Sequence, residues 1–192
     1  MLMESWSMGE EYSLVRILVP KKEKGTSTLR AKQDLFTYLN KTRRTIKISG
    51  AMMGASWMGS HLTNDDLMKD SRYSDDFDIA LSGRGEVDGA PTYIFTLTPK
   101  PDAPVVWGKV TVEIRQGDYL PVSQTFYDED GVKVRGMTYG DYKTVSGKLI
   151  PTTMRMQPLD GSGEYTQIVW KKMAFNVDID EGYFTLQRLK AM

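Results

Sequence analysis

The chain has 192 residues, of which 40% are hydrophobic and 26% charged, a balance typical of a folded domain rather than a disordered segment. Its 25 Lys and Arg residues equal its 25 Asp and Glu residues, which argues against the strongly positive charge typical of nucleic-acid-binding proteins. The absence of Cys excludes disulfides and thiolate metal sites. No stretch approaches the roughly 18 apolar residues of a membrane-spanning helix.

The first part of the chain predicts an antiparallel meander. Apolar and β-branched runs at 12–19 and 26–30 flank a charged turn at 20–25, and apolar residues at 36–38 and 46–48 continue the pattern. Charge is uneven along the chain, because residues 1 to 50 carry ten Lys or Arg against five acids, whereas the next fifty carry four against eight. We therefore expect the ends of the fold to differ in the sign of their net charge.

The second part predicts further strands, for about ten in total. Apolar residues alternate along 93–97 and 109–115, so each of these strands should have one face in the core, and 109–115 should have one face in water. The Asp-Gly pair within 128–131 and the Ser-Gly pair at 146–147 are typical of tight hairpin turns. The run 165–175 could form a final strand.

One segment, residues 50–70, breaks the strand pattern. Thr63 can cap a helix, and Asp66, three residues later, can bond back to it. Leu62 and Leu67 occupy the apolar positions on either side of this cap. A short helix is therefore predicted from about 64 to 70.

Catalytic motifs are weak in this sequence. His61 is the single histidine, and one His without Cys excludes a typical zinc site. Ser56 lies in a run that resembles the Gly-x-Ser-x-Gly nucleophile elbow, but Met58 stands where the motif needs Gly. The glycines at 83–89 lack the spacing of a dinucleotide-binding loop and are interpreted as a turn between strands.

The most distinctive segment is apolar. Met52, Met53, Trp57, Met58 and Leu62 lie within eleven residues, among glycines that make the backbone easy to rearrange. Because the Met side chain adapts to irregular partners, such a segment suits a lid over a variable apolar ligand. Ordinary core packing is the alternative interpretation, and composition alone favours it.

These runs also resemble a known family. The resemblance extends in order over nearly the whole chain, and the Trp-Met-Gly-Ser and Thr-Asn-Asp-Asp boxes at 57–66 are its most specific parts. The sequence resembles the bacterial outer membrane lipoprotein-sorting family of the LolA-like superfamily, through the runs 5–9, 43–48, 52–60, 63–67, 97–101, 106–109, 118–121 and 126–131.

The resemblance implies a mainly β fold with few short helices, in which a curved antiparallel sheet forms an unclosed β-barrel, or half-barrel, covered by a helical lid. It implies a single domain over 1–192. Relatives usually begin with a signal peptide, a first helix and one more strand. We expect this chain to lack all three. His61 stands where an acid is expected in relatives, which weakens a catalytic role there.

The implied function is that of a non-enzymatic periplasmic carrier or chaperone that binds acyl chains of lipoproteins or lipids for transport to the outer membrane. Its expected partners are an inner-membrane transporter and an outer-membrane acceptor, with no nucleic acid, cofactor or metal. An uncovered edge strand or apolar patch would favour a homodimer. The implied acyl-chain and lid residues are Met52, Met53, Trp57, Met58, Leu62 and Leu67, with Arg43 or Arg44 as the arginine that locks the lid.

Two other functions stay open. The same fold could be an envelope interaction module that docks on a transporter without lipid cargo, its cavity filled by its own side chains. A weaker alternative is a lipid-cleaving enzyme that uses Ser56, His61 and a nearby Asp.

Overall fold

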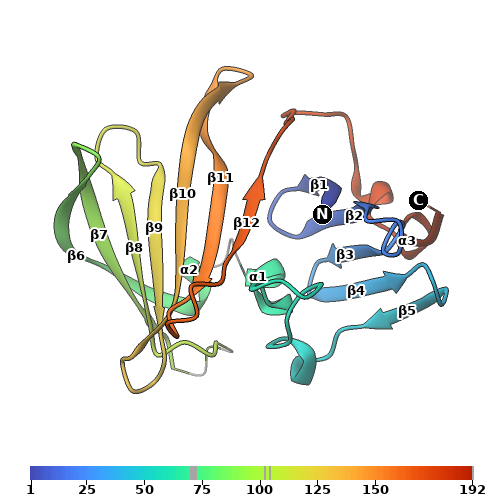
Figure 1. The fold of residues 1–192 in the computed structure, drawn as a ribbon, viewed down its shortest axis with the longest axis horizontal. Helices are drawn as coiled ribbons and strands as arrows, with labels where there is room; N and C mark the ends of the chain where they lie inside the picture. The colour runs from blue at the N-terminus through green and yellow to red at the C-terminus, as the bar shows by residue number, and fades with distance from the viewer. Residues whose placement is uncertain (70–72, 102, 104, 192) are drawn as a thin grey trace. The chain divides into compact units, whose positions relative to one another are not determined.

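The chain folds into two compact units in the computed structural model, which describes residues 1–69, 73–101, 103 and 105–191. Strands contain 52% of the residues and helices 11%, so the predicted mainly β class is confirmed. The five-stranded unit comprises residues 1–58, 63–71 and 177–192, and the seven-stranded unit comprises 59–62 and 72–176 (Figure 1). Each unit contains one antiparallel sheet.

The five-stranded sheet is a simple meander in which each strand pairs with the next along the chain. Its strands are β1 (Leu2–Met8), β2 (Tyr12–Val19), β3 (Ser27–Ala31), β4 (Asp34–Leu39) and β5 (Arg44–Lys47). The run at 12–19 and the three strands after it match the sequence prediction, whereas β1 was not predicted.

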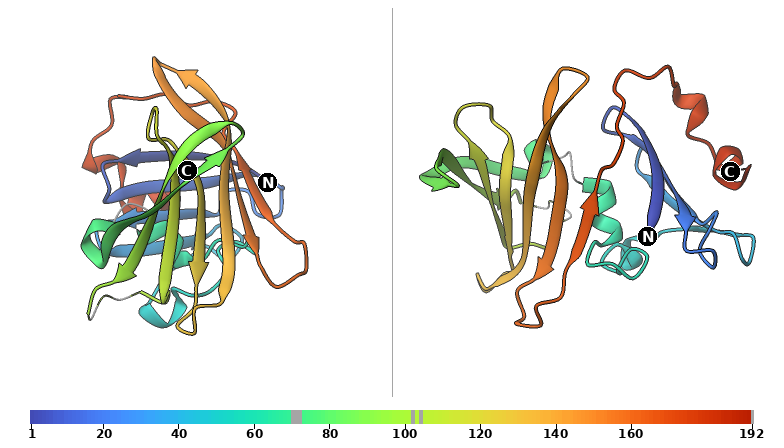
Figure 2. Two further views of the ribbon diagram at one scale, coloured as in Figure 1. Left: turned by 90° about the vertical axis from the view of Figure 1, so that its left-hand side faces the viewer. Right: turned by 45° about the horizontal axis from the view of Figure 1, so that its top comes forward.

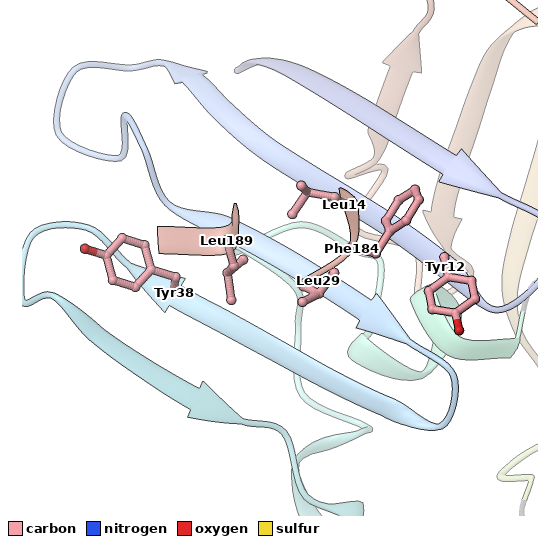
Figure 3. Packing of buried hydrophobic residues seen from close by; sticks show 6 residues of the cluster. All are labelled: Tyr12, Leu14, Leu29, Tyr38, Phe184 and Leu189. Carbon is pink, nitrogen blue, oxygen red and sulfur yellow. The ribbon is translucent and has the colours of Figure 1, made fainter. Parts of the chain in front are cut away.

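One face of this sheet carries a hydrophobic core (Figure 3). Leu14 on β2 lies directly opposite Leu29 on β3, and both are fully buried. The C-terminal segment covers them, because Phe184 and Leu189 pack into the same cluster. Burying each such side chain stabilises the fold by about 1.5–3 kcal/mol.

The segment that covers this face contains the 3-10 helix η2 (Glu181–Tyr183) and the helix α3 (Leu186–Ala191). The phenol of Tyr12 on β2 donates a hydrogen bond to Oε2 of Glu181 at 2.7 Å. This bond to a carboxylate raises the pKa of Tyr12. A hydrogen bond therefore joins the C-terminal segment to the sheet, in addition to the hydrophobic packing.

The seven-stranded sheet also follows the chain, in the order β12-β11-β10-β9-β8-β7-β6. Figure 2 shows its pronounced twist, as expected for antiparallel strands. The four-residue helix α2 (Tyr73–Asp76) precedes it. The strands are β6 (Phe77–Val87), β7 (Ala90–Pro99), β8 (Lys109–Arg115), β9 (Pro121–Tyr127), β10 (Lys133–Val145), β11 (Lys148–Pro158) and β12 (Thr166–Val169).

Two-residue turns fix the register of two hairpins in this sheet. Asp88 and Gly89 join β6 to β7, and Ser146 and Gly147 join β10 to β11; all four have positive φ, between 50° and 79°. Such turns match the right-handed twist of the strands that they connect. The Ser-Gly turn was predicted, but the turn assigned to 83–89 is shorter than expected, because residues up to Val87 belong to β6.

The predicted single curved sheet differs from the structure, in which the strands form two sheets and neither closes into a barrel. Between β5 and β6, the described residues form the 3-10 helix η1 (Gly50–Met52), α1 (Asn64–Lys69) and α2, together with turns and a lone bridge. This segment therefore separates the two sheets along the chain. The predicted final strand is also shorter, since β12 ends at Val169. No helix among the described residues is long and apolar enough to cross a membrane.

Candidate functional site

The seven-stranded sheet has one apolar face. Residues directly opposite each other on paired strands share a face, so the register assigns Leu97, Val110 and Phe126 to a single row across β7, β8 and β9. The same face continues through the other strands. Its apolar side chains, here called the apolar face, are Ile79, Leu81, Tyr93, Phe95, Leu97, Val110, Val112, Ile114, Val122, Phe126, Met137, Tyr139, Met154, Met156 and Ile168.

Burial across the apolar face is uneven. Val110 and Met156 are fully buried, whereas Ile79 and Leu81 on the edge strand β6 are 49% and 54% exposed. Phe95, like its neighbours Tyr93, Val112 and Ile114, is only half-buried. The apolar face therefore has partly exposed aromatic and aliphatic side chains near the β6 edge.

The opposite face of the sheet is largely polar. On β7 and β8 it carries Thr92 and Glu113, and the Thr92 hydroxyl donates a hydrogen bond to Oε1 of Glu113 at 2.6 Å. Ser123 on β9 donates a second bond to Oε2 of the same carboxylate at 3.1 Å. The two faces therefore differ chemically, and the apolar face is the one suited to an apolar ligand.

Two polar side chains interrupt the apolar face. Gln124 is buried; its Oε1 accepts a hydrogen bond from the phenol of Tyr73 on α2 at 2.9 Å, and its Nε2 donates to the phenol of Tyr139 at 3.3 Å. Arg135, also buried, lies over the rings of Trp107 and Phe126, with 4.5 and 4.3 Å between its guanidinium carbon and the ring centres. An apolar surface with a few placed polar groups is typical of ligand-binding sites.

The predicted lid segment folds onto the five-stranded sheet. Trp57 is only 5% exposed, and its Nε1 donates a hydrogen bond to Oγ1 of Thr28 on β3 at 3.1 Å. On the same strand and the same face, Arg30 donates from Nη1 to the carbonyl of Leu67 in α1 at 3.5 Å. Residues before and within α1 are therefore attached to neighbouring positions of β3.

The helix predicted from about 64 to 70 is confirmed over Asn64–Lys69 as α1, and residue 70 lies outside the described residues. The expected reciprocal cap is present, because the Thr63 amide donates to Oδ2 of Asp66 at 2.7 Å and the Asp66 amide donates to Oγ1 of Thr63 at 3.2 Å. Two further bonds close the segment on itself: Asn64 donates from Nδ2 to the Met52 carbonyl, and the Asp65 amide donates to the Met53 carbonyl. These hydrogen bonds fix the backbone of residues 52–62, here called the Met-rich segment, relative to α1.

The six predicted acyl-chain residues do not form one cluster within a single unit. Met52, Met53, Trp57, Met58 and Leu67 belong to the five-stranded unit, and Leu62 belongs to the seven-stranded unit. Met52 is 38% exposed, and Trp57 and Leu62 are buried; the side chains of Met53, Met58 and Leu67 are half-buried.

The predicted lid-locking arginines have a different environment. Arg43 and Arg44 are exposed, and neither side chain makes a hydrogen bond or ion pair with any residue that the structure describes. Arg30 is instead the arginine that bonds to α1. Sequence reasoning missed it because it lies in the middle of a strand, although a charged residue in an otherwise uncharged strand run was an available signal.

The groups considered for catalysis are engaged in other contacts. Nδ1 of His61 lies 3.0 Å from Oγ1 of Thr166, and its Nε2 lies 3.7 Å from Oε2 of Glu164. Ser56 forms an isolated β-bridge with Thr63 within the five-stranded unit. Within the described part of the chain, no three His, Asp or Glu side chains form a group that could hold a metal ion.

Comparison with known proteins identifies the fold. A chain described as a DUF1329 family protein from Desulfovibrio piger is 26% identical, with a TM-score of 0.85 over 93% of this chain and 76% of that chain. An outer membrane lipoprotein-sorting protein domain from Vibrio parahaemolyticus has a TM-score of 0.82 at 21% identity, covering 98% and 82% of the two chains. A LolA superfamily protein from Nitrosomonas europaea has a TM-score of 0.72 at 21% identity, covering 96% and 81%.

At the level of sequence, no curated protein matches this chain. A family model described as an uncharacterized protein matches residues 9–191 and so spans both units. The resemblance drawn from the sequence motifs is confirmed by the structural matches. The chain therefore belongs to the family of uncharacterized proteins that this model describes, and its fold is similar to that of a LolA superfamily protein and of an outer membrane lipoprotein-sorting protein domain.

Proposed function

We propose that this protein is a non-enzymatic carrier that binds acyl chains of lipoproteins or other lipids on the apolar face of the seven-stranded sheet. The observation that carries the proposal is the exposure of Ile79 and Leu81 on a face whose other side chains are almost all apolar. An acyl chain that covers such a surface is stabilised by about 0.8 kcal/mol for each buried CH2 group. The similarity to lipoprotein-sorting proteins supports the same class of ligand.

Separately, we propose that the Met-rich segment at 52–62 can contact an acyl chain through its adaptable Met side chains. The contact residues carried over from the sequence are Met52, Met53, Trp57, Met58, Leu62 and Leu67. Arg30, through its bond to the Leu67 carbonyl, holds α1 against β3. Trp57 anchors the segment through Thr28.

The proposed location is the periplasm, and the proposed route leads from an inner-membrane transporter to an outer-membrane acceptor. These assignments rest on the similarity to outer membrane lipoprotein-sorting proteins. We also propose that the protein forms a homodimer through the β6 edge or through the exposed part of the apolar face.

The direct test is a titration with a fluorescent long-chain fatty acid, followed by displacement with phospholipid and with a triacylated lipopeptide. Leu81→Glu places a charge on the exposed part of the apolar face and should weaken binding about tenfold or more, a loss of at least 1.4 kcal/mol. Ala80→Glu is the matched control, because Ala80 is exposed on the same strand but lies on the opposite face.

Equal binding by the two variants would contradict the proposed site. A complete lack of saturable, displaceable binding by the unmodified protein would contradict the carrier function and favour the interaction module without cargo. Trp57→Asp is a poorer test, since Trp57 is buried and hydrogen bonded, so its loss would disturb the fold as well as the ligand.

A further inference from the structure

Two turns of the five-stranded sheet gather positive charge at one end. The β2–β3 connection contains Lys21, Lys22 and Lys24, and the β4–β5 connection leads into Arg43 and Arg44. We call the exposed cations of these two turns the basic tip, which consists of Lys21, Lys22, Lys24, Lys41, Arg43 and Arg44.

The two turns are held side by side. In a meander, the connections after β2 and after β4 lie at the same end of the sheet, and Figure 3 shows both at its left. Nδ2 of Asn40 in the second turn donates a hydrogen bond to the carbonyl of Lys24 in the first, at 2.9 Å. Gly25 permits this approach, because a Cβ atom there would lie 2.7 Å from the Asn40 amide nitrogen.

The positive charge of the basic tip is poorly compensated. Glu23 is the one acid within the two turns, and it lies 3.9 Å from Lys22. By contrast, Lys47 at the opposite end of the sheet is paired with Asp34 at 2.7 Å. Within the described residues, Lys22 is the single member of the basic tip with an ion pair, although the whole chain has no net charge.

Exposed apolar side chains adjoin the basic tip. Val19, the last residue of β2, is 51% exposed, and Leu2, which lies opposite it on β1, is 44% exposed. Cations beside small apolar side chains suit the interface of an anionic membrane, where the charges meet headgroups and the apolar groups enter the acyl boundary. An acidic protein would use the cations but leave Val19 and Leu2 without a specific partner.

We propose that the basic tip docks the five-stranded unit on a membrane surface that contains anionic phospholipids. This docking is independent of the apolar face and of any cargo bound there. Each Lys or Arg near such a surface strengthens binding about fivefold, and the attraction should weaken as ionic strength rises.

The test is sedimentation of the protein with vesicles of phosphatidylglycerol and phosphatidylcholine in equal parts, compared with vesicles of phosphatidylcholine alone. The protein should bind the first and not the second. The variant Lys21→Gln/Lys24→Gln/Lys41→Gln should bind the anionic vesicles about 100-fold more weakly. The control Lys133→Gln/Lys143→Gln/Lys172→Gln removes the same charge from exposed positions of the seven-stranded unit and should bind as the unmodified protein does.

Three results would overturn the proposal. These are equal binding to both kinds of vesicle, equal loss of binding in the two triple variants, and binding to poly-glutamate without binding to anionic vesicles. The last result would assign the basic tip to an acidic protein partner. Because all six substituted lysines are exposed, circular dichroism of the variants should match that of the unmodified protein.

Discussion

Gln124 and Arg135 place polar groups within an otherwise apolar surface. Burying a polar group without a hydrogen bond is costly, and Gln124 avoids this cost through the phenols of Tyr73 and Tyr139. Arg135 is covered by the rings of Trp107 and Phe126, which attract its positive charge. At the scale of single residues, both buried polar groups are therefore engaged by contacts within the seven-stranded unit.

A second ionic contact leads to a prediction about pH. Arg115 forms a hydrogen-bonded ion pair with Asp118, and this bond lowers the pKa of the Asp118 carboxyl. Since the folded pKa is depressed, the pair should stabilise the fold above the ordinary pKa of Asp, about 4, and lose that effect as pH falls through the folded value. NMR titration of the Asp118 carboxyl should give a pKa below that range.

Arg115→Ala is the variant that checks the cause, and it should return the pKa of Asp118 toward its ordinary value. Asp160 provides an internal reference, because the pKa of its carboxyl is lowered mainly by a hydrogen bond from Ser162 and should not respond. An unchanged Asp118 titration in Arg115→Ala would show that the ion pair does not set it.

Among the elements, the connection between β7 and β8 depends on one glycine. The Gly108 amide donates to the carbonyl of Tyr127 at 3.0 Å, and a Cβ atom at position 108 would lie 2.3 Å from the Asp128 carbonyl oxygen. Gly108→Ala should therefore displace the end of β9 and destabilise the protein by about 1–3 kcal/mol in urea-induced unfolding.

Gly117→Ala is the matched control for that prediction. Gly117 also lies in a connection between strands, but nothing comes within 4 Å of its Cβ position. Its substitution should change the free energy of unfolding by less than about 0.5 kcal/mol. Similar losses in both variants would argue against a specific contact at Gly108.

The elements also explain how far sequence reasoning could reach. Turn chemistry and local pairing identified the Ser146 and Gly147 hairpin, and the Thr63 and Asp66 cap identified α1, because both signals lie within a few residues. The glycines at 83–89 predict a turn, but Gly83 and Gly85 also tolerate a strand, and the structure places both in β6. The sequence pattern assigns Ile79 and Leu81, which precede these glycines, to no strand, so the exposed part of the candidate site could not be predicted from it.

Division of the strands between two sheets could not be predicted from such local signals. Period-two alternation specifies which side chains share a face, but it does not specify where hydrogen bonding between successive strands stops. The role of Trp57 shows the same limit. The composition of the segment around it suits either a core or a lid, and the bond from Trp57 to Thr28 joins residues 29 positions apart.

For the whole molecule, the first strands and the last helix share one core. Leu189 in α3 is fully buried against the sheet, whereas Leu186 in the same helix is exposed. Leu189→Ala should reduce the free energy of unfolding by about 2–5 kcal/mol and speed amide exchange in β3 and β4. Leu186→Ala is the control and should have little effect, so equal losses would contradict the assigned packing.

The discontinuous five-stranded unit has a consequence for synthesis on the ribosome. Its sheet is translated before the seven-stranded sheet, whereas Phe184 and Leu189, which cover Leu14 and Leu29, follow that sheet in the chain. The seven-stranded sheet comes from one continuous stretch and can form while synthesis continues. Until residues 184–189 emerge from the ribosome, the hydrophobic side chains of the five-stranded sheet therefore stay uncovered. During this period chaperones would recognise them, and premature termination would leave the protein prone to aggregate.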